Sequence, residues 1–532
     1  MVDQIRVVTV TVPSGSTLVD FTHPEITEAF SAAIFIYSAF TTDDTDNAHG
    51  VLGIGFVAPD PGAGTEEQGM CSHAQSGQNT TPNCGVRHSI ANAAITVGDP
   101  ASANAATPIA VAAYSASIAG GVRMNFTTSA IDLKVTAILF AGLARAYTDD
   151  CSSTSAGVHE SVGGTTDFEP DLVVFAATSN ALNTNQADAI PNIGFALNKA
   201  GIPQVCAVVN ADDATEPSDA DGYTRTDAAF TAFLGGIRTT PEHSVVTSFD
   251  STGFNHTSNA GSPAAHYLAL KFSGAVRMAC AHLAAPGSTG VAAFNAFGFT
   301  PDLVLGMSTL LGSLDTLIDG PTASCSGFFV TGRHGSRSYT WHHEEGLTLG
   351  GAVVANANSR QEDVAVLTYE HTGGIAQRAT WAGASGGGGF LLDFSVATAG
   401  HLTALGIQLA PNPPLMPHGA MRAAPGADRA RPRRVWVGGK LKRLSSLFAR
   451  LAWTTQRWAA FDRVHHRRRV PQTIRPVGLP SDEETKGRAL APGLVRGRTL
   501  SVTDGSVGRV LTPGLARGRT TGPGVASPDI EP

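Results

Sequence analysis

The densest group of potential metal ligands in the sequence is the segment Trp341–Gly346, WHHEEG, which places two histidines beside two glutamates. Both side-chain types are zinc ligands. Neighbouring side chains of a strand point to opposite faces, however, so His342 and His343 cannot reach the same ion without a bulge, and the helical spacing His-Glu-x-x-His is absent. We therefore expect a polar strand end here, with metal binding as the alternative.

Two acidic segments are the next candidates, because carboxylates are the usual ligands of loop-bound Ca²⁺. They are Asp43–Asn47, DDTDN, and Asp212–Gly222, DDATEPSDADG. Neither has the twelve-residue spacing with glycine at position six that an EF-hand loop requires. The sequence favours solvated loops at both places, with Ca²⁺ binding as the alternative.

The motifs of nucleotide-binding enzymes are missing from the chain. There is no Walker A loop and no dinucleotide-binding fingerprint. Glycosidase chemistry depends on a separation between two carboxylates that a sequence does not contain. His266 and His401 begin similar apolar segments, and we interpret them as strand histidines. We expect no enzyme, and we predict no catalytic, cofactor-binding or metal-binding residues.

The cysteines also point away from metal or disulfide chemistry. They form no C-x-x-C pair, and no histidine lies at a spacing suited to a zinc finger. We expect reduced thiols that pack as small hydrophobic side chains. The six residues are Cys71, Cys84, Cys151, Cys206, Cys280 and Cys325.

Composition favours a β-rich protein with an acidic body and a basic tail. Of 532 residues, 42% are hydrophobic, only 15% are charged and 59 are glycine, which suits short strands joined by turns. Residues 412–532 hold 22 Lys+Arg and 8 Asp+Glu, or +14, which leaves 14 and 36, or −22, for residues 1–411. The N-terminal segment lacks the apolar region of a signal peptide, and no apolar run approaches ~20 residues, so we expect neither Sec-dependent secretion nor a membrane span.

A recurring phrase divides the chain into similar units. FEPDLVVF at Phe168 returns as FTPDLVLG at Phe299, and a weaker form, FSAAIFIY, begins at Phe30. We expect each phrase to begin a strand that is covered on both faces, since its apolar run is continuous. Two further landmarks recur in each unit, a glycine in an apolar run (Gly55, Gly194 and Gly327) and an apolar closing segment (from Val135, His266 and His401).

These landmarks predict an all-β fold of three tandem antiparallel β-sandwich repeats with jelly-roll-like topology, followed by a basic tail. We place the sandwich repeats at residues 1–148, 149–286 and 287–411. The tail is expected to comprise a Pro/Arg-rich linker at 412–434, a basic amphipathic helix at 435–470 and an extended segment at 471–532.

The segments F(T/E)PDLV, SFDSTGF (Ser248–Phe254) and HYLAL resemble a repeat found in virion structural proteins of tailed bacteriophages and prophages. The resemblance is closest over residues 158–411. In residues 1–148 the proline of the first phrase is absent, and VTAIL stands in place of HYLAL. The resemblance implies a particle component of the tail or fibre type, and it implies no active site.

The predicted helix at 435–470 has apolar side chains near helical spacing, interleaved with Lys and Arg. We expect it to dock on another virion protein or on a second copy of the chain. A membrane surface and the chain's own β-domains are the alternatives. The expected contact residues are Leu441, Leu444, Phe448, Leu451, Trp458 and Phe461.

The extended segment contains its own repeat. LAPGLVRGRT (Leu490–Thr499) returns as LTPGLARGRT (Leu511–Thr520) with eight identities in ten, and such segments suit addition to a neighbouring surface. The run HHRRR (His465–Arg469) has no nucleic-acid-binding motif beside it, so no specific nucleic acid is expected. The acidic body of a neighbouring subunit is an electrostatic partner for this tail. The expected contact residues are Arg496, Arg498, Arg517 and Arg519.

Together these features predict a phage virion structural protein, assembled in the host cytoplasm. We expect a minor tail, tail-tip or fibre-like component that acts in assembly, with attachment to a host-surface glycan as a further role. The first alternative is a capsid decoration protein, and the second is a tailspike-type polysaccharide hydrolase. A homo-oligomer is expected, although three sandwiches in one chain would also supply a threefold arrangement by themselves.

Overall fold

The structure is a computed structural model that describes residues 2–47, 49–59, 66–75, 85–99, 108–152, 157–162, 167–178, 184–187, 191–211, 220–233, 242–259, 264–343, 357–370, 373–409, 434–437 and 440–443. The chain divides into two compact units, Met1–Asn412 and Pro413–Pro532. In the described residues the only helix is the 3-10 turn η1 (Pro321–Ala323), and every strand pairing is antiparallel, so the all-β prediction is confirmed. None of the described helices is long and apolar enough to cross a membrane.

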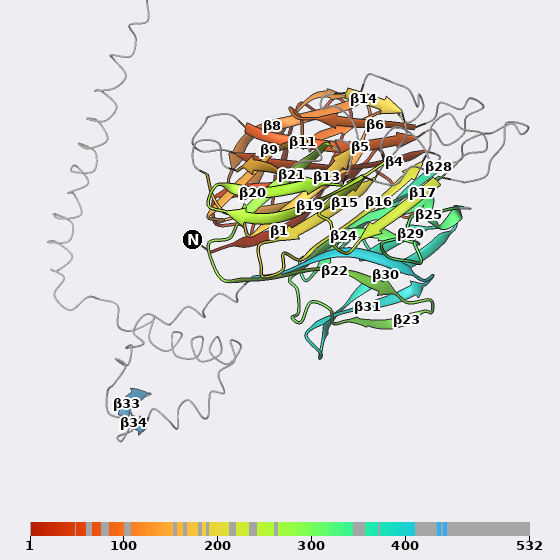
Figure 1. Ribbon diagram of the computed structural model, residues 1–532. Helices are drawn as coiled ribbons and strands as arrows, with labels where there is room; N and C mark the ends of the chain where they lie inside the picture. Colours follow the sequence, from red (N-terminus) through yellow and green to blue (C-terminus); the bar gives the residue numbers. More distant parts are fainter. Residues whose placement is uncertain are drawn as a thin grey trace, which may run out of the picture. The chain divides into compact units, whose positions relative to one another are not determined.

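Three larger sheets form most of the first unit (Figure 1). They share one strand order. The first is β1 (Gln4–Val12), β10 (Leu133–Ala141), β3 (Phe30–Ser38), β4 (Gly50–Pro59), β5 (Glu66–Gln75) and β6 (Gly85–Ile90). The second is β11 (Arg145–Ser152), β21 (Ala264–Lys271), β13 (Leu172–Thr178), β15 (Asn192–Leu197), β16 (Gln204–Ala211) and β17 (Ala220–Arg225). The third is β22 (Val276–Ala285), β32 (Gly400–Leu409), β24 (Leu303–Thr309), β26 (Cys325–Gly332), β27 (Arg337–His343) and β28 (Ala357–Glu362).

Each larger sheet faces a smaller, four-stranded sheet. The first is β2 (Leu18–Thr22), β9 (Gly121–Ser129), β8 (Ala110–Ile118) and β7 (Ile95–Val97). The second is β12 (Val158–Ser161), β20 (Gly253–Ser258), β19 (Glu242–Asp250) and β18 (Phe230–Ala232). The third is β23 (Gly290–Phe294), β31 (Gly389–Val396), β30 (Ile375–Ser385) and β29 (Val366–Tyr369). Because apolar side chains from both sheets of each pair pack in one cluster, each pair is a β-sandwich, and we name them the first, second and third sandwich.

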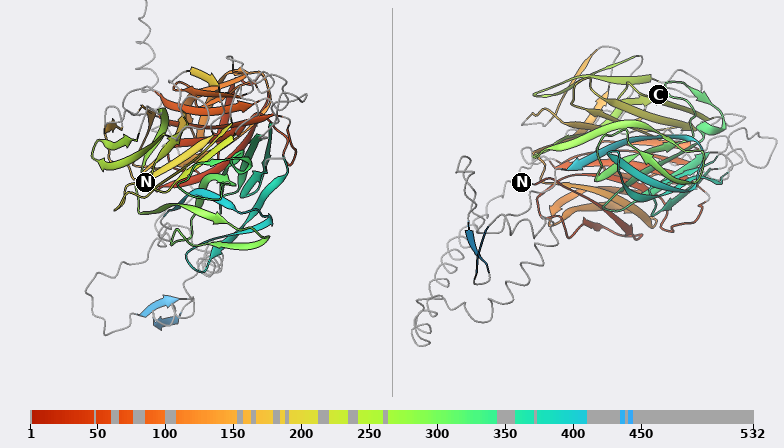
Figure 2. Two further views of the ribbon diagram at one scale, coloured as in Figure 1. Left: turned by 45° about the vertical axis from the view of Figure 1, so that its right-hand side comes forward. Right: turned by 90° about the horizontal axis from the view of Figure 1, so that it is seen from below.

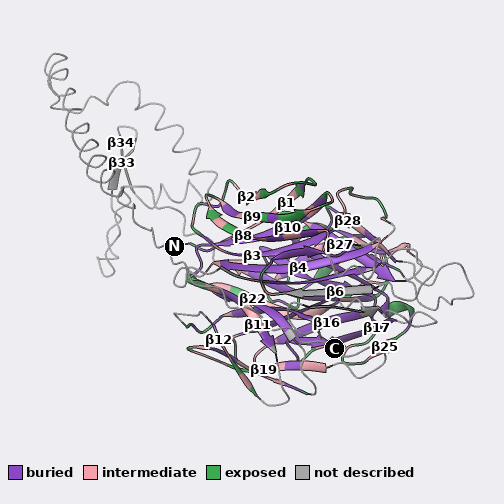
Figure 3. Ribbon diagram, turned by 90° about the horizontal axis from the view of Figure 1, so that it is seen from above, coloured by how far each residue is buried: buried purple, intermediate pink, exposed green. Residues whose placement is uncertain are grey.

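The outer faces of the three larger sheets are also buried, because they meet one another in a single central core. Ile34 of the first sandwich, Val174 of the second and Leu305 of the third all lie in this core, and each is fully buried. The three sandwiches lie around it (Figure 2), and buried residues run along strands such as β3 and β4 (Figure 3). The prediction of strands covered on both faces is therefore confirmed for β13 and β24, whose described side chains are buried throughout.

A short segment of each sandwich pairs with the next one, so that the three form a closed ring. Strand β14 (Thr184–Ala187), which connects β13 to β15, pairs with β6 of the first sandwich. Strand β25 (Ile318–Asp319), which connects β24 to β26, pairs with β17 of the second sandwich. The connection between β3 and β4 completes the cycle, because Asn47 bridges to Ser359 on β28 of the third sandwich. Each segment covers the outer strand of its neighbour's larger sheet, where unpaired backbone groups would otherwise be exposed.

The recurring phrase has a structural explanation that includes its aspartate. Asp171 accepts hydrogen bonds from the backbone nitrogen of Phe272 at 2.9 Å and from Nζ of Lys271 at 2.8 Å. In the third sandwich, Asp302 accepts from the backbone nitrogen of Leu409 at 2.9 Å. The aspartate of each phrase thus fixes the end of the closing strand, and the strands themselves begin just after it, at Leu172 and Leu303.

Strand pairing moves two of the predicted landmarks in the third sandwich. Leu172 pairs with Leu270, and the matching Leu303 pairs with Ile407, so His266 corresponds to Thr403 rather than to His401. Likewise Gly194 lies opposite Phe175, whereas Gly327 lies opposite Ser308, two residues beyond the matching position. A shift of two residues keeps a side chain on the same face, which is why the predicted pattern of apolar positions still fits.

The predicted boundaries at residues 148 and 286 each lie near a strand that pairs within the following sandwich. Residue 148 lies inside β11, which pairs with the second sandwich, and residue 286 directly follows β22, which pairs with the third. The boundaries stay a prediction, as does the jelly-roll-like topology.

The predicted helix at 435–470 is wrong at its beginning. Residues Arg434–Val437 form β33, which pairs with β34 (Lys440–Arg443) in a hairpin that includes Leu441. Val435 and Val437 are β-branched, and the dipeptide Gly438–Gly439 between the strands favours a two-residue hairpin connection. The rest of the predicted helix lies outside the described residues.

Candidate functional site

The histidines of WHHEEG are core residues. His342 and His343 lie on β27 and are fully buried, and the Nδ1 atom of His342 accepts a hydrogen bond from the backbone nitrogen of Asn358 at 3.2 Å. Burial lowers the pKa of His343 to about 4, so this side chain is neutral at physiological pH. Glu344 and Glu345 lie outside the described residues.

The acidic segment Asp43–Asn47 binds side chains of other strands rather than solvent alone. Asp43 accepts hydrogen bonds from Arg337 and Lys134. Asp46 accepts from Arg360 at 3.1 Å and from the hydroxyl of Tyr369 at 2.6 Å. Burial acts to raise the pKa of Asp43, but the hydrogen bonds from Arg337 and Lys134 outweigh it and the pKa lies below its usual value. These carboxylates therefore hold the first sandwich to the third. In the segment Asp212–Gly222, residues 212–219 lie outside the described part of the chain.

Most residues predicted to bind partners lie beyond the described ranges. Leu441 alone of them is described, on β34. The others, for which contact with a partner stays a prediction, are Leu444, Phe448, Leu451, Trp458, Phe461, Arg496, Arg498, Arg517 and Arg519.

The second sandwich contains a group of ligand-type side chains that the sequence analysis did not single out. Cys151 of β11 lies across the sandwich from Glu160 of β12 and His256 of β20, and their sulfur, oxygen and nitrogen atoms lie within 4.8 Å of one another. The Nε2 atom of His256 lies 3.0 Å from Oε1 of Glu160, and its Nδ1 atom lies 2.9 Å from the hydroxyl of Ser244 on β19. Cys151 and His256 are buried, whereas Glu160 is 17% exposed. We name these four residues the polar set.

The polar set lies beside further carboxylates. Burial, followed by the charge of Asp149, raises the pKa of Asp150 to about 6. Burial also raises the pKa of the Cys151 thiol well above its ordinary value, with further contributions from Glu160, Asp150 and Asp149. This end of the sandwich therefore concentrates negative charge around a buried sulfur atom.

The row Ser244, His256 and Glu160 has the residue types of a serine-hydrolase triad but not its geometry. In a triad, Nε2 of the histidine faces the serine and Nδ1 faces the acid. Here Nδ1 faces Ser244 and Nε2 faces Glu160. Ser244 is also fully buried, so a substrate has no access to its hydroxyl. The arrangement does not provide a nucleophile.

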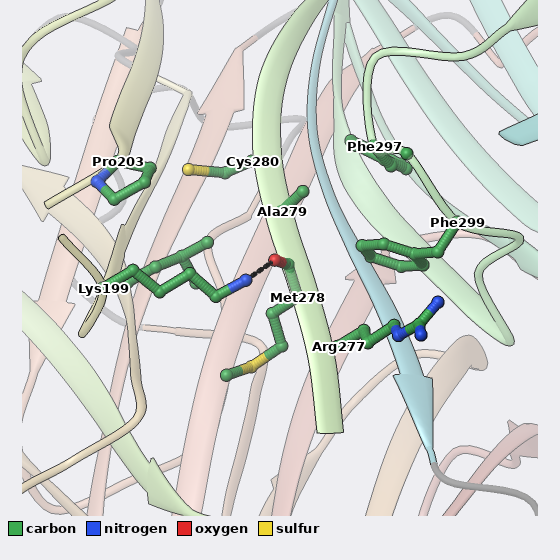
Figure 4. Close-up of a pocket in the computed structure, with 10 residues that line it drawn as sticks. Lys199, Pro203, Arg277, Met278, Ala279, Cys280, Phe297 and Phe299 are labelled. Atoms are coloured by element: carbon green, nitrogen blue, oxygen red, sulfur yellow. Dashed lines mark hydrogen bonds between the residues drawn. The ribbon is translucent and has the colours of Figure 1, made fainter. Parts of the chain in front are cut away.

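A separate pocket of about 420 Å³ lies where the second and third sandwiches meet (Figure 4). Phe297 and Phe299 are stacked, with ring centroids 6.0 Å apart, and line one side. On the other side Lys199 donates a hydrogen bond to the backbone oxygen of Met278. Arg277 also lines the pocket and is exposed.

The described cysteines agree with the expectation of reduced thiols. Cys71, Cys151, Cys206 and Cys325 are buried, Cys280 is half-buried, and all five are free thiols. Cys84 lies outside the described residues.

No protein-family model matches the chain, and a search of curated proteins returns no match.

Proposed function

We propose that the chain is a structural component of a bacteriophage or prophage virion, of the minor tail, tail-tip or fibre type, and that it acts through assembly rather than through a chemical step. The virion part of this proposal comes from the resemblance of F(T/E)PDLV, SFDSTGF and HYLAL to the repeat of such proteins.

The observation that carries the structural part is the closed ring of sandwiches around one core. The three larger sheets bury their outer faces against one another, and each sandwich pairs a segment with its neighbour. Such a body resists separation of its parts, because parting two sandwiches would expose apolar faces and unpaired strand edges together. A particle component that must stay rigid under load benefits from this arrangement.

The basic segment 412–532 supplies the proposed attachment. Its charge of +14 contrasts with −22 for residues 1–411, so the tail of one subunit is attracted to the body of another. We propose that it binds other virion proteins or further copies of this chain.

Attachment to an acidic host-surface glycan is a second candidate role, and the pocket between the second and third sandwiches favours it. The pocket is lined by the exposed Arg277 and by the stacked Phe297 and Phe299, a combination of charge and aromatic surface that suits an acidic sugar. Binding of the full chain to a glycan array, lost on Arg277→Ala but retained on Arg145→Ala, would support this role. Binding that both variants retain would contradict it.

Quantitative mass spectrometry of purified particles tests the main proposal, with the major capsid protein as the internal standard. A few copies per particle are expected for a tail or tail-tip component. Hundreds of copies would indicate a capsid decoration protein instead. Absence from particles would refute the structural role, and polysaccharide depolymerisation by the purified chain would then favour the hydrolase alternative.

A further inference from the structure

The polar set occupies positions that are apolar in the other two sandwiches. The hairpins β8–β9, β19–β20 and β30–β31 show this directly, because the second strand of each begins at a glycine: Gly121, Gly253 or Gly389. Three residues after these glycines stand Met124, His256 and Leu392. Met124 and Leu392 are core residues of their sandwiches, so His256 replaces an apolar side chain.

The same comparison holds for the remaining three positions. Glu160 pairs with Phe254, the first residue after Gly253, and Ser244 pairs with Ser258, the fifth residue after it. Cys151 pairs with Ala265 on the closing strand. The counterparts in the first sandwich are Phe21, Ala112 and Val10. Those in the third are Phe294, Ala379 and Leu283.

Three exchanges of apolar for polar side chains (Glu160, Ser244 and His256), beside the Cys151 thiol, call for a compensating interaction, and the hydrogen bonds among these three side chains supply part of it. A buried polar group costs free energy unless it is fully bonded, and replacing phenylalanine by glutamate also removes packing. The fold does not need these residues, since two sandwiches with the same strand order keep apolar side chains there. A ligand shared by the polar set would account for all of them together.

We propose that Cys151, Glu160 and His256 bind a divalent transition-metal ion, of which zinc fits best. Thiolate, imidazole and carboxylate together are a typical zinc donor set, whereas Ca²⁺ and Mg²⁺ take oxygen ligands alone. Ligand atoms around tetrahedral zinc lie about 3.3–3.6 Å apart, given its bond lengths of about 2.0–2.3 Å. The Nε2 atom of His256 and Oε1 of Glu160 are 3.0 Å apart, and the sulfur of Cys151 lies within 4.8 Å of both. Side-chain adjustments of about an ångström would bring all three onto one ion.

Ser244 is then a positioning residue. Its hydroxyl lies 2.9 Å from Nδ1 of His256. In the metal-bound tautomer Nδ1–H donates a hydrogen bond to this hydroxyl, and the Nε2 lone pair is left for the metal. Glu160 is the most exposed member of the polar set, at 17%, and lies on the edge strand β12, so water can reach the fourth coordination position from this side.

The ion would connect the two sheets of the second sandwich, because Cys151 lies on the larger sheet and the other two ligands lie on the smaller one. Metal binding should therefore raise the unfolding temperature. This inference departs from the expectation that the chain binds no metal. It is independent of the proposed virion role, since a structural metal is compatible with a tail, a decoration protein or an enzyme.

The test uses the full chain without a polyhistidine tag, dialysed against EDTA. Titration with ZnCl₂ is followed by calorimetry, and titration with Co²⁺ is followed by optical absorption, because thiolate-bound cobalt has a charge-transfer band in the near ultraviolet. The variants Cys151→Val and His256→Met copy the residues of the first sandwich, so they should fold, and circular dichroism checks this. Cys280→Ala is the matched control, since its thiol lies in the third sandwich.

We expect a single tight equivalent of Zn²⁺, a cobalt–thiolate band and a higher unfolding temperature with zinc, all retained in Cys280→Ala and lost in the two ligand variants. Ser244→Ala should weaken zinc binding by about 10- to 100-fold. Equal zinc binding by wild type and both ligand variants would overturn the proposal and assign the binding to other histidines. Absence of binding, or of the cobalt–thiolate band, in the folded wild-type chain would overturn it as well.

Discussion

Replacing Arg337 with alanine should weaken the contact that closes the ring between the first and third sandwiches. The side chain of Arg337 lies on β27 and is only 1% exposed. It donates one hydrogen bond to Asp43, in the connection between β3 and β4, and another to Asp363 at 2.7 Å. The centroid of the Tyr339 ring lies 5.2 Å from the guanidinium carbon. Arg337 thus joins two sandwiches through a buried cation.

The expected cost follows from the exposure of the partners. Asp363 is 78% exposed, so its pair with Arg337 contributes about 0–1 kcal/mol. Asp43 is 28% exposed, and removing the buried partner of an ion pair costs about 3–5 kcal/mol. Lys134 also binds Asp43 and would keep part of its charge compensated. We therefore expect Arg337→Ala to lower the free energy of unfolding by about 3 kcal/mol, at the low end of that range.

Urea denaturation followed by tryptophan fluorescence measures this change, because Trp341 lies buried on the same strand. Arg123→Ala is the matched control. Arg123 makes a bidentate pair with Asp20 at 2.6 and 2.8 Å, but both side chains are about 40% exposed and screened by solvent, so its loss should change the free energy of unfolding much less than the loss of Arg337. A double-mutant cycle of Arg337→Ala with Asp43→Asn should give a coupling energy of about 1 kcal/mol or more.

Two results would refute this reasoning. One is an Arg337→Ala variant that is no less stable than Arg123→Ala. The other is additivity of the Arg337 and Asp43 changes, which would mean that the two side chains do not stabilise each other.

Two further predictions concern packing and pH. Gly194→Ala should lower the free energy of unfolding by about 1–3 kcal/mol or more, because an added Cβ would lie 1.7 Å from the backbone oxygen of Ala229. Gly312 has open space around it, so Gly312→Ala should be neutral in the same urea assay. Equal effects of the two substitutions would contradict this prediction. Burial lowers the pKa of His343 and of His266 to about 4, below the value of ~6.5 in an unfolded chain. Between about pH 4 and ~6.5 the unfolded state therefore binds more protons than the folded state. The free energy of unfolding should fall as the pH drops from about 6.5 toward about 4. Urea midpoints measured from pH 7 to 5 should therefore decline, less steeply in His343→Gln, and a flat wild-type profile would count against the buried neutral histidines.

Local pattern was enough to predict the fold class. Continuous apolar runs such as DLVVFAA indicate strands covered on both faces, and the structure buries β13 in this way. Frequent turn residues indicate short antiparallel strands. Sequence pattern was less informative about the aspartate of the phrase, because the partners of Asp171 lie about a hundred residues away, at Lys271 and Phe272.

The ring could not be predicted from local pattern, because each closing contact is remote in sequence. Asn47 and Ser359 form a β-bridge although most of the sequence of the first unit lies between them, and neither segment contains a pattern that specifies the other. The beginning of the predicted helix failed for a different reason. Apolar residues at mixed spacing fit a helix and a short hairpin alike, and the two glycines after Val437 were the stronger signal.

The polar set was missed because Cys151, Glu160 and His256 have no motif spacing, although the repeats contained a usable signal. Aligning the three hairpin glycines places His256 in a column with methionine and leucine. A single polar residue in an otherwise apolar column is the feature to seek in a repeated chain.

That asymmetry also gives a physical reason for fusing three sandwiches in one chain. A closed ring of three identical subunits would repeat every residue three times, so a polar set tolerated at one interior would have to be tolerated at all of them. In the fused chain, the first and third sandwiches keep apolar side chains at the four positions of the polar set, and among the described residues the second sandwich has ligand-type side chains there. The exchange therefore lowers the stability of one sandwich alone, and the pairings of β14 and β25 connect that sandwich to its two neighbours. Tandem fusion therefore permits a site that a symmetric trimer of the same sandwich could only carry in triplicate.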